Sequence, residues 1–142
     1  MKRRVIRTTN ELKMMLDESG RIAAEQRSLP MSFAETLVMI MKRKKVTRGK
    51  LAELSMLSEN TISRMRSSDD YSPTKQMVLA VCVALELSPT EAISLFDKAG
   101  LSLKLTNAQD VAYHYILCNC GGYTLDEIND ALYDSGFETI GF

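Results

Sequence analysis

Apolar residues recur three or four positions apart along most of the chain, which is the spacing that gives an α-helix one apolar face. Polar stretches containing Gly, Pro, Ser or Asp separate these segments. The pattern predicts helices over residues 10–26, 33–45, 48–54, 59–66, 74–85, 89–99, 107–118 and 125–133. It predicts no strand, so we expect an all-α protein.

Capping residues mark where several of these helices begin. Ser32, Thr47 and Ser58 each stand before a periodic segment, where a hydroxyl can accept a hydrogen bond from an orphaned backbone N–H. Ser88 is followed by Pro89 and Glu91, and Thr124 is followed by Glu127. Both patterns are typical of a capping box, in which the cap and the residue three positions on exchange hydrogen bonds. These signals fix the starts of the helices more firmly than the periodicity does.

The segment 46–66, VTRGKLAELSMLSENTISRMR, carries the most specific pattern. It predicts two short helices joined by a tight corner, each with one apolar stripe against a common core. The second helix keeps its polar and basic side chains on the outside. A supported helix with a hydrogen-bonding outer face is what the major groove of DNA accepts.

This segment resembles the helix-turn-helix of lambda-repressor-like (Xre-type, Cro/C1-type) regulators. The matching residues are Thr47, Leu51, Ala52, Glu53, Leu57, Ser58, Thr61, Ile62, Ser63 and Arg64. The resemblance continues through Leu87-Ser88-Pro89 and covers about residues 33–100. It implies a lambda-repressor-like five-helix bundle, with an N-terminal helix and a two-helix C-terminal extension. We therefore expect an N-terminal helix or arm over 1–30, the helix-turn-helix domain over 31–100 and the extension over 101–142.

The resemblance also implies which side chains meet DNA. The base-reading positions are Glu59, Asn60, Ser63 and Arg64. Arg can donate two hydrogen bonds to guanine, Asn can pair both ways with adenine, and Glu can accept from the cytosine amino group. The expected phosphate contacts are Arg43, Lys45, Thr47, Arg48, Lys50 and Arg66. Arg48 and the first amides of its helix suit a phosphate.

Three features of the sequence depart from the family pattern. Glu59 replaces a Gln that relatives more often have, and its carboxylate repels the DNA backbone. Met56 takes the corner position often held by Gly, which predicts a looser or differently built corner. Asp69 and Asp70 stand where relatives place basic or neutral residues. These departures support an alternative, in which a degenerate helix-turn-helix serves as a module that binds a toxin, a peptidase or another protein.

The last forty residues predict two more helices. In the first, we expect Val111, Tyr115 and Ile116 to face inward. The terminal segment GFETIGF is apolar and is expected to dock on the bundle. Around Asp126-Glu127-Ile128-Asn129 and Gly141, this tail resembles the extension of helix-turn-helix domains associated with ImmA/IrrE-type metallopeptidases. The chain has one His and no HExxH, so it does not carry the zinc site of that peptidase.

The formal net charge of the 142 residues is zero, but the charges are unevenly distributed. Residues 42–66 hold eight basic and two acidic side chains, a net +6, whereas residues 67–100 sum to −3 and residues 101–142 to −5. A concentrated positive patch on the predicted reading helices is typical of a polyanion-binding protein. The acidic C-terminal third suits a basic partner. The chain has no long apolar run and no secretory signal, so we expect a cytoplasmic protein that does not enter membranes.

His114, Cys118 and Cys120, with Cys82, suggest a metal site, because His114 and Cys118 share a helix face. However, the CxC spacing is unusual for zinc, and Cys82 stands in an apolar segment where cysteine packs as a small hydrophobe. We therefore expect no metal, no cofactor and no enzymatic activity, since no nucleophile elbow or phosphate loop is present.

The sequence thus predicts a DNA-binding transcriptional regulator, acting as a repressor or as an antitoxin-like protein on double-stranded DNA. Such regulators usually bind as dimers, so a homodimer is expected. A protein partner would bind residues 10–26 or 101–142.

Overall fold

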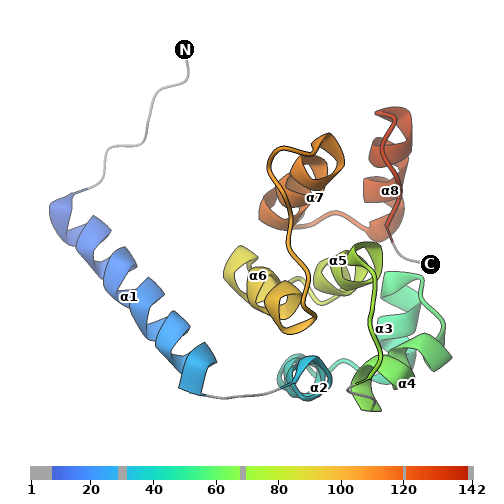
Figure 1. Cartoon of the computed structure of the whole chain (residues 1–142), viewed down its shortest axis with the longest axis horizontal. Coiled ribbons are helices and arrows are strands. Elements are labelled where there is room, and N and C mark those ends of the chain that lie inside the picture. The colour runs from blue at the N-terminus through green and yellow to red at the C-terminus, as the bar shows by residue number, and fades with distance from the viewer. Residues whose placement is uncertain (1–7, 29–31, 68–69, 120, 141–142) are drawn as a thin grey trace. The chain divides into compact units, whose positions relative to one another are not determined.

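The computed structural model describes residues 8–28, 32–67, 70–119 and 121–140. These residues form helices joined by turns and loops (Figure 1). The helices are α1 (Thr9–Ser28), α2 (Phe33–Lys44), α3 (Arg48–Ser55), α4 (Glu59–Ser67), α5 (Lys75–Ala84), α6 (Pro89–Lys98), α7 (Ala108–Asn119) and α8 (Leu125–Asp134). The fold is therefore the expected all-α, lambda-repressor-like one. Leu29, Pro30, the loop residue Asp69, Cys120, Gly141 and the basic residues of 1–7 lie outside the described residues.

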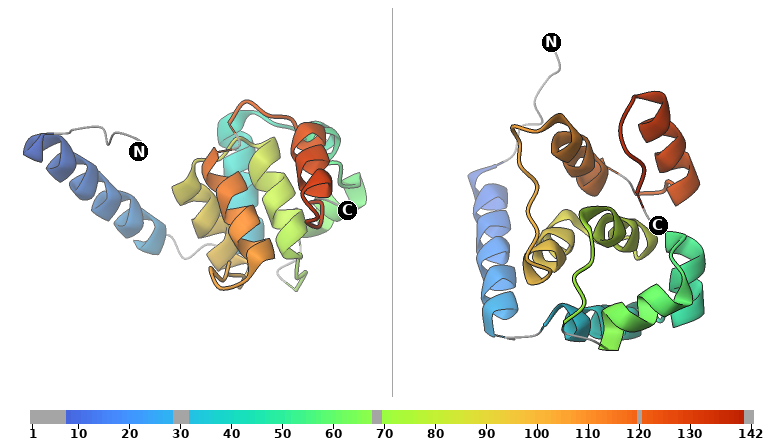
Figure 2. Two further views of the ribbon diagram at one scale, coloured as in Figure 1. Left: turned by 90° about the horizontal axis from the view of Figure 1, so that it is seen from above. Right: turned by 45° about the vertical axis from the view of Figure 1, so that its right-hand side comes forward.

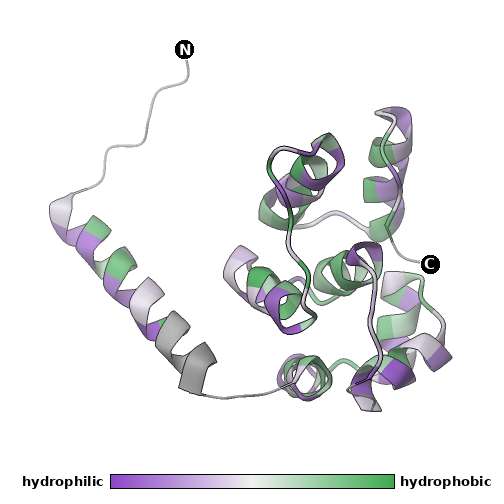
Figure 3. Ribbon diagram, in the orientation of Figure 1, coloured by the Kyte–Doolittle hydropathy of each residue, from purple (hydrophilic) through white to green (hydrophobic). Residues whose placement is uncertain are grey.

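The chain divides into two compact units, residues 1–30 and 31–142. The first contains α1, which runs through Gly20 without interruption. Hydrophobic and hydrophilic residues alternate along the ribbon of its first turns (Figure 3). No helix among the described residues has the length and apolar composition needed to cross a membrane.

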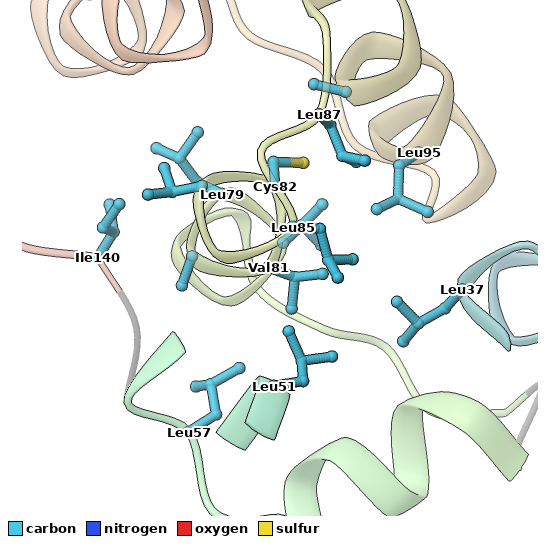
Figure 4. Packing of buried hydrophobic residues seen from close by; sticks show 14 of the residues in the cluster. Leu37, Leu51, Leu57, Leu79, Val81, Cys82, Leu85, Leu87, Leu95 and Ile140 are labelled. Atoms are coloured by element: carbon cyan, nitrogen blue, oxygen red, sulfur yellow. The ribbon is translucent and has the colours of Figure 1, made fainter. Parts of the chain in front are cut away.

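Helix α5 is the centre of the second unit. Its residues Val78 to Val83 are all buried, because the segment is apolar on every side. It contacts α3, α6, α7 and α8, while α2 packs against α4 and α6. Figure 4 shows Leu37, Leu51 and Ile140 approaching α5 from three directions. Residues 101–142 thus share one hydrophobic core with residues 31–100.

The predicted caps are present. Ser32, Thr47, Ser88 and Thr124 each accept a hydrogen bond from the backbone N–H three residues on. Thr74, which the pattern placed inside its helix, caps α5 in the same way. The capping boxes at Ser88 and Thr124 are confirmed, and Ser32 forms a third one with Glu35. Gly100 follows the Ala99 C-cap of α6 with a positive φ of 73°, the conformation that glycine commonly adopts after the end of a helix.

The inward face predicted for α7 is wrong. The structure buries Tyr113, Leu117 and Asp110, leaves Val111 and Ile116 half-buried, and exposes 66% of Tyr115. The cause is that α7 has apolar side chains on more than one face, so its periodicity does not single out the face that packs on α5. The docked terminus is confirmed, because Ile140 is fully buried. The Asn129 side-chain amide donates to Ile140 O (3.0 Å), and its oxygen accepts from Ile140 N (2.8 Å).

Candidate nucleic-acid interface

Helix α3 begins at the polar surface and packs its centre into the core. The Thr47 hydroxyl accepts from Lys50 N (3.2 Å), while Leu51 and Ser55 are fully buried. This orientation leaves Arg48, Gly49 and Lys50 exposed at the start of the helix. The exposed first turn therefore offers backbone amides and two cations in one place.

The corner between α3 and α4 has the backbone shape that glycine would give it. Met56 adopts the left-handed conformation, with φ 61° and ψ 20°. The differently built corner that Met56 predicted in place of glycine is therefore not observed. Ser55 Oγ accepts from Leu57 N (3.4 Å), and Leu57 is buried. The two helices consequently meet at a tight turn, as Figure 2 shows in its right-hand view.

Helix α4 is held from beneath by two fully buried side chains, Ile62 and Met65. Its start is capped by Ser58, whose hydroxyl accepts from Thr61 N (3.1 Å). The spacing of the buried pair sends residues 59, 60, 63 and 64 to the opposite side of the helix. The structure therefore brings the four predicted base-reading residues onto one face.

Arg48 ties the start of α3 to this face. Its Nη1 donates to Ser63 Oγ (3.1 Å), and its Nε lies 3.9 Å from Glu59 Oε1. Gly49 allows this close approach, because a Cβ there would lie 3.2 Å from the same Glu59 oxygen. Glu59 and Ser63 are thus engaged by Arg48, a link that sequence analysis missed because the partners are 11 and 15 residues apart.

Asn60 and Arg64 differ from their neighbours on α4. Both are exposed, and neither makes a side-chain hydrogen bond or an ion pair with any residue that the structure describes. Their donors and acceptors are satisfied by solvent and are available to a ligand.

The predicted phosphate contacts have different surroundings. Lys45 and Lys50 are exposed, and Lys50 Nζ lies 3.8 Å from Glu53 Oε1. The Arg43 guanidinium forms an ion pair with Glu91 on α6. Arg66 is half-buried, and its Nε is buried without a hydrogen-bond partner among the described residues.

The ion pair of Arg43 has an electrostatic signature on Glu91. Partial burial by itself raises the pKa of Glu91, but hydrogen bonds from Arg43 and from Ser88 N outweigh it, so that the pKa lies below its usual value. Glu91 is therefore ionised at neutral pH and holds the Arg43 side chain toward α6.

Among the residues of the metal hypothesis that the structure describes, His114, Cys118 and Cys82 do not form a metal-binding group. Cys82 is buried in the core of α5, and His114 Nδ1 lies 4.0 Å from the Sγ of exposed Cys118. Among the described residues, no group of three or more His, Cys, Asp or Glu side chains could hold a metal ion. Cys120 lies outside them.

The comparisons with known proteins point to the same region as the geometry. No curated protein and no solved structure matches the chain. Residues 36–98, which contain α3, the corner and α4, match the family model of the Cro/C1-type HTH DNA-binding domain.

Proposed function

We propose that the protein is a sequence-specific DNA-binding transcriptional regulator, either a repressor or the DNA-binding antitoxin of a toxin–antitoxin pair. The observation that carries the proposal is the polar face of α4, with residues 59, 60, 63 and 64 on one side and buried Ile62 and Met65 on the other. In this proposal α4 enters the major groove and α3 braces it against the DNA backbone.

Asn60 and Arg64 are the base-reading residues that the surroundings favour. Their side chains are exposed, and Asn suits the N6 and N7 of adenine while Arg suits the O6 and N7 of guanine. Glu59 and Ser63 contact the bases at the edge of this pair, with Arg48 balancing the carboxylate charge. With the Arg48 cation beside it, the Glu59 carboxylate is repelled less strongly by nearby phosphates. Glu59 can then accept a hydrogen bond from a cytosine amino group.

The phosphate contacts flank this face on α2, α3 and the end of α4. Lys45, Lys50 and Arg48 are exposed cations at or next to the first turn of α3. The N-terminal amides behind the Thr47 cap add partial positive charge to that turn. Arg43 and Arg66 complete the patch, with Arg43 exchanging its contact with Glu91 for a phosphate.

The test is a titration of the protein with the double-stranded DNA upstream of its own gene, at low and at moderate salt. We expect specific binding by the wild type and a loss of at least about a hundredfold in Asn60→Ala/Arg64→Ala, since each base contact contributes about 1–3 kcal/mol. Lys104→Ala is the charge-matched control: Lys104 is exposed outside residues 36–98, and its hydrogen bonds among the described residues are made by its backbone, which the substitution keeps. It should bind like the wild type.

A protein-interaction module is the second candidate, favoured by the exposed Asp70 and by the Glu59 carboxylate beside the reading face. In that case the wild type retards no DNA even at low salt, and a protein partner co-purifies after nuclease treatment. The expected contact regions are residues 10–26 and 101–142. An antitoxin would show both behaviours, because it holds DNA and toxin through different surfaces.

A further inference from the structure

An apolar groove of about 1050 Å³ lies between α7 and α8. Both helices pack on α5 and have little contact with each other, so their facing sides stay uncovered. Figures 1 and 2 both show the two helices side by side above α5. The walls are mainly apolar and include Val111, Tyr115 and Ile116 on α7, and Ile128, Ala131 and Leu132 on α8.

The groove has the shape and length of a site for a third helix. Helices of 12 and 10 residues make walls about 18 and 15 Å long, which is the length of about three helical turns. The aliphatic and aromatic side chains between these walls are partly exposed. A contiguous apolar surface rimmed by polar residues marks an interaction site, and an open groove between two helices suits the apolar face of an amphipathic helix.

The rim of the groove on α8 is acidic. Glu127, Asp130 and Asp134 are exposed, and their spacing places them on one face of α8 with groove residue Ala131, along about 10 Å of the helix. The hydrogen bond from Thr124 N to Glu127 Oε1 (2.9 Å) lowers the pKa of Glu127, so this carboxylate is charged at neutral pH. No lysine or arginine is found among the described residues that line the groove. A helix in the groove would therefore meet negative charge along one edge.

The chain itself does not supply a helix with the opposite charge. Helix α1 lies outside the bundle, but Thr9–Ser28 carries three basic and four acidic side chains, a net −1. The helices α2 to α8 are already packed around the shared core of the second unit. The acidic rim thus favours a helix from another protein over a helix from a second copy of this chain.

We infer that the groove binds an amphipathic helix of a partner protein, which has an apolar stripe of about three turns and lysine or arginine side chains along the edge that lies over α8. The apolar stripe covers the exposed side chains between α7 and α8, and the cations lie beside the carboxylates of the rim. Such a partner gives the protein-interaction function proposed above its site, and on that function this inference rests. It does not depend on DNA binding.

Fluorescence anisotropy of labelled synthetic peptides, titrated with the full chain, tests the inference. Three peptides of about 14 residues, or about four helical turns, are compared. The first has leucine at helical spacing and lysine at the polar positions. The second has glutamate in place of the lysine, and the third keeps the lysine but has serine in place of the leucine. We expect the first peptide to bind at least tenfold more tightly than either of the others.

A pair of variants shows whether the first peptide lies in the groove. Leu105 and Tyr115 line the groove and are 67% and 66% exposed, so Leu105→Ser/Tyr115→Ser removes apolar groove surface and leaves the core intact. We expect this variant to bind the peptide at least tenfold more weakly. Ile93→Ser/Tyr133→Ser is the matched control, because these side chains are 47% and 77% exposed and lie outside the groove. It should bind like the wild type, and circular dichroism checks that both variants keep the fold.

A second pair of variants tests the acidic rim. Asp130→Asn/Asp134→Asn should weaken binding of the first peptide about three- to tenfold, because exposed ion pairs are individually weak. Asp70→Asn/Asp97→Asn removes the same number of exposed carboxylates elsewhere in the second unit and should bind like the wild type. Equal losses in the two variants would mean that the peptide is attracted by acidic side chains in general, and would overturn the assignment of the rim.

Other results would overturn the inference as a whole. The wild type could bind none of the peptides, or it could bind both leucine peptides equally, in which case charge does not select the partner. Undiminished binding by Leu105→Ser/Tyr115→Ser would place the peptide elsewhere on the chain. A dimer of the chain that the peptide dissociates would show that a second copy occupies the groove. The DNA titrations are independent of these results, because residues 59–66 on α4 do not line the groove.

Discussion

At the scale of single residues, three non-glycine residues in the part of the chain that the structure describes adopt the left-handed backbone conformation. Lys45, Met56 and Glu86 have φ values of 57°, 61° and 52°. Each follows the last residues of a helix, α2, α3 and α5 respectively, and turns the chain sharply toward the next helix. A residue with a Cβ pays about 1–2 kcal/mol for this conformation.

Replacing Met56 with glycine should stabilise the protein. Relief of the left-handed strain gains about 1–2 kcal/mol, and the greater freedom of glycine in the unfolded chain removes about 0.5–1 kcal/mol of that gain. We expect a net stabilisation of about 0.5–1 kcal/mol in urea unfolding. Met56→Ala keeps the Cβ and is the control; a Met56→Gly protein no more stable than Met56→Ala would argue against strain at the corner.

Asp110 is a buried carboxylate that joins α7 to its neighbours. It accepts from Lys104 N (2.8 Å) and from Lys75 Nζ (3.0 Å), and it is 4% exposed. The hydrogen bond from Lys104 N and the Lys75 ammonium outweigh the effect of burial, so the pKa of Asp110 lies below its usual value. The ionised form is therefore the one that stabilises the fold.

Asp110→Asn should destabilise the protein by about 1–3 kcal/mol at pH 7, because the amide cannot replace a charged acceptor shared by two donors. The folded-state pKa is lowered, so the contribution of Asp110 is complete above the unfolded-state value near 3.8 and is lost as the pH falls through the folded-state pKa. Equilibrium unfolding of the wild type and of Asp110→Asn between pH 7 and pH 2.5 measures the difference between their free energies of unfolding. A difference that stays constant down to pH 2.5 would contradict the assignment.

At the scale of whole elements, the sequence predicts helices better than it predicts what they face. Helix starts follow from local chemistry, since the cap hydroxyl and the backbone N–H that donates to it are three residues apart. The structure places Ser88 and Thr124 where the pattern put them. The buried face of α7 depends on α5, and the pairing of Asp110 with Lys75 joins residues 35 positions apart. The contact of Arg48 with α4 is likewise tertiary, so spacing along the chain does not reveal it.

The contact of Arg48 with α4 predicts that a substitution of Arg48 lowers DNA affinity much more than it lowers the free energy of unfolding. The Arg48–Glu59 pair is solvent-exposed, so Arg48→Ala should cost less than about 1 kcal/mol of stability. It should weaken DNA binding about tenfold or more, because a phosphate contact is lost and Glu59 is left without its cation. DNA titrations of Arg48→Ala and Arg48→Ala/Glu59→Gln check this. If removing the carboxylate recovers none of the affinity, Arg48 does not act by balancing Glu59.

The C-terminal segment is held by one buried side chain, Ile140, and by side-chain hydrogen bonds to its backbone, in which Gln109 bonds Glu138 and Asn129 bonds Ile140. Ile140 is fully buried, and Asn129 bonds both of its backbone polar groups. Ile140→Ala should therefore destabilise the protein by about 2–4 kcal/mol, the usual range for a large-to-small change in a core. Urea unfolding measures it, with Ile93→Ala on the exposed face of α6 as the control that should change stability little.

At the scale of the whole molecule, the distribution of charge matters more than its sum. Residues 42–66 carry a net +6, and residues 67–142 carry −8. Salt at 0.1 M screens electrostatic interactions over about 10 Å. DNA bound at residues 42–66 is therefore attracted by these residues more strongly than it is repelled by the acidic residues 67–142. A neutral chain can therefore bind a polyanion.

This distribution predicts a steep salt dependence of DNA binding. If about four to six phosphates are neutralised, the affinity should fall by roughly 100- to 2000-fold between 50 and 200 mM salt, since log K falls by about 0.9 per phosphate contact for each tenfold rise in salt. Titrations at four salt concentrations give the slope. Lys50→Ala should reduce this slope by about the amount that one phosphate contact contributes. Asn60→Ala should lower the affinity at every salt concentration and leave the slope unchanged. A slope near zero in the wild type would mean that the basic patch does not lie on the DNA backbone, and would favour the protein-interaction alternative.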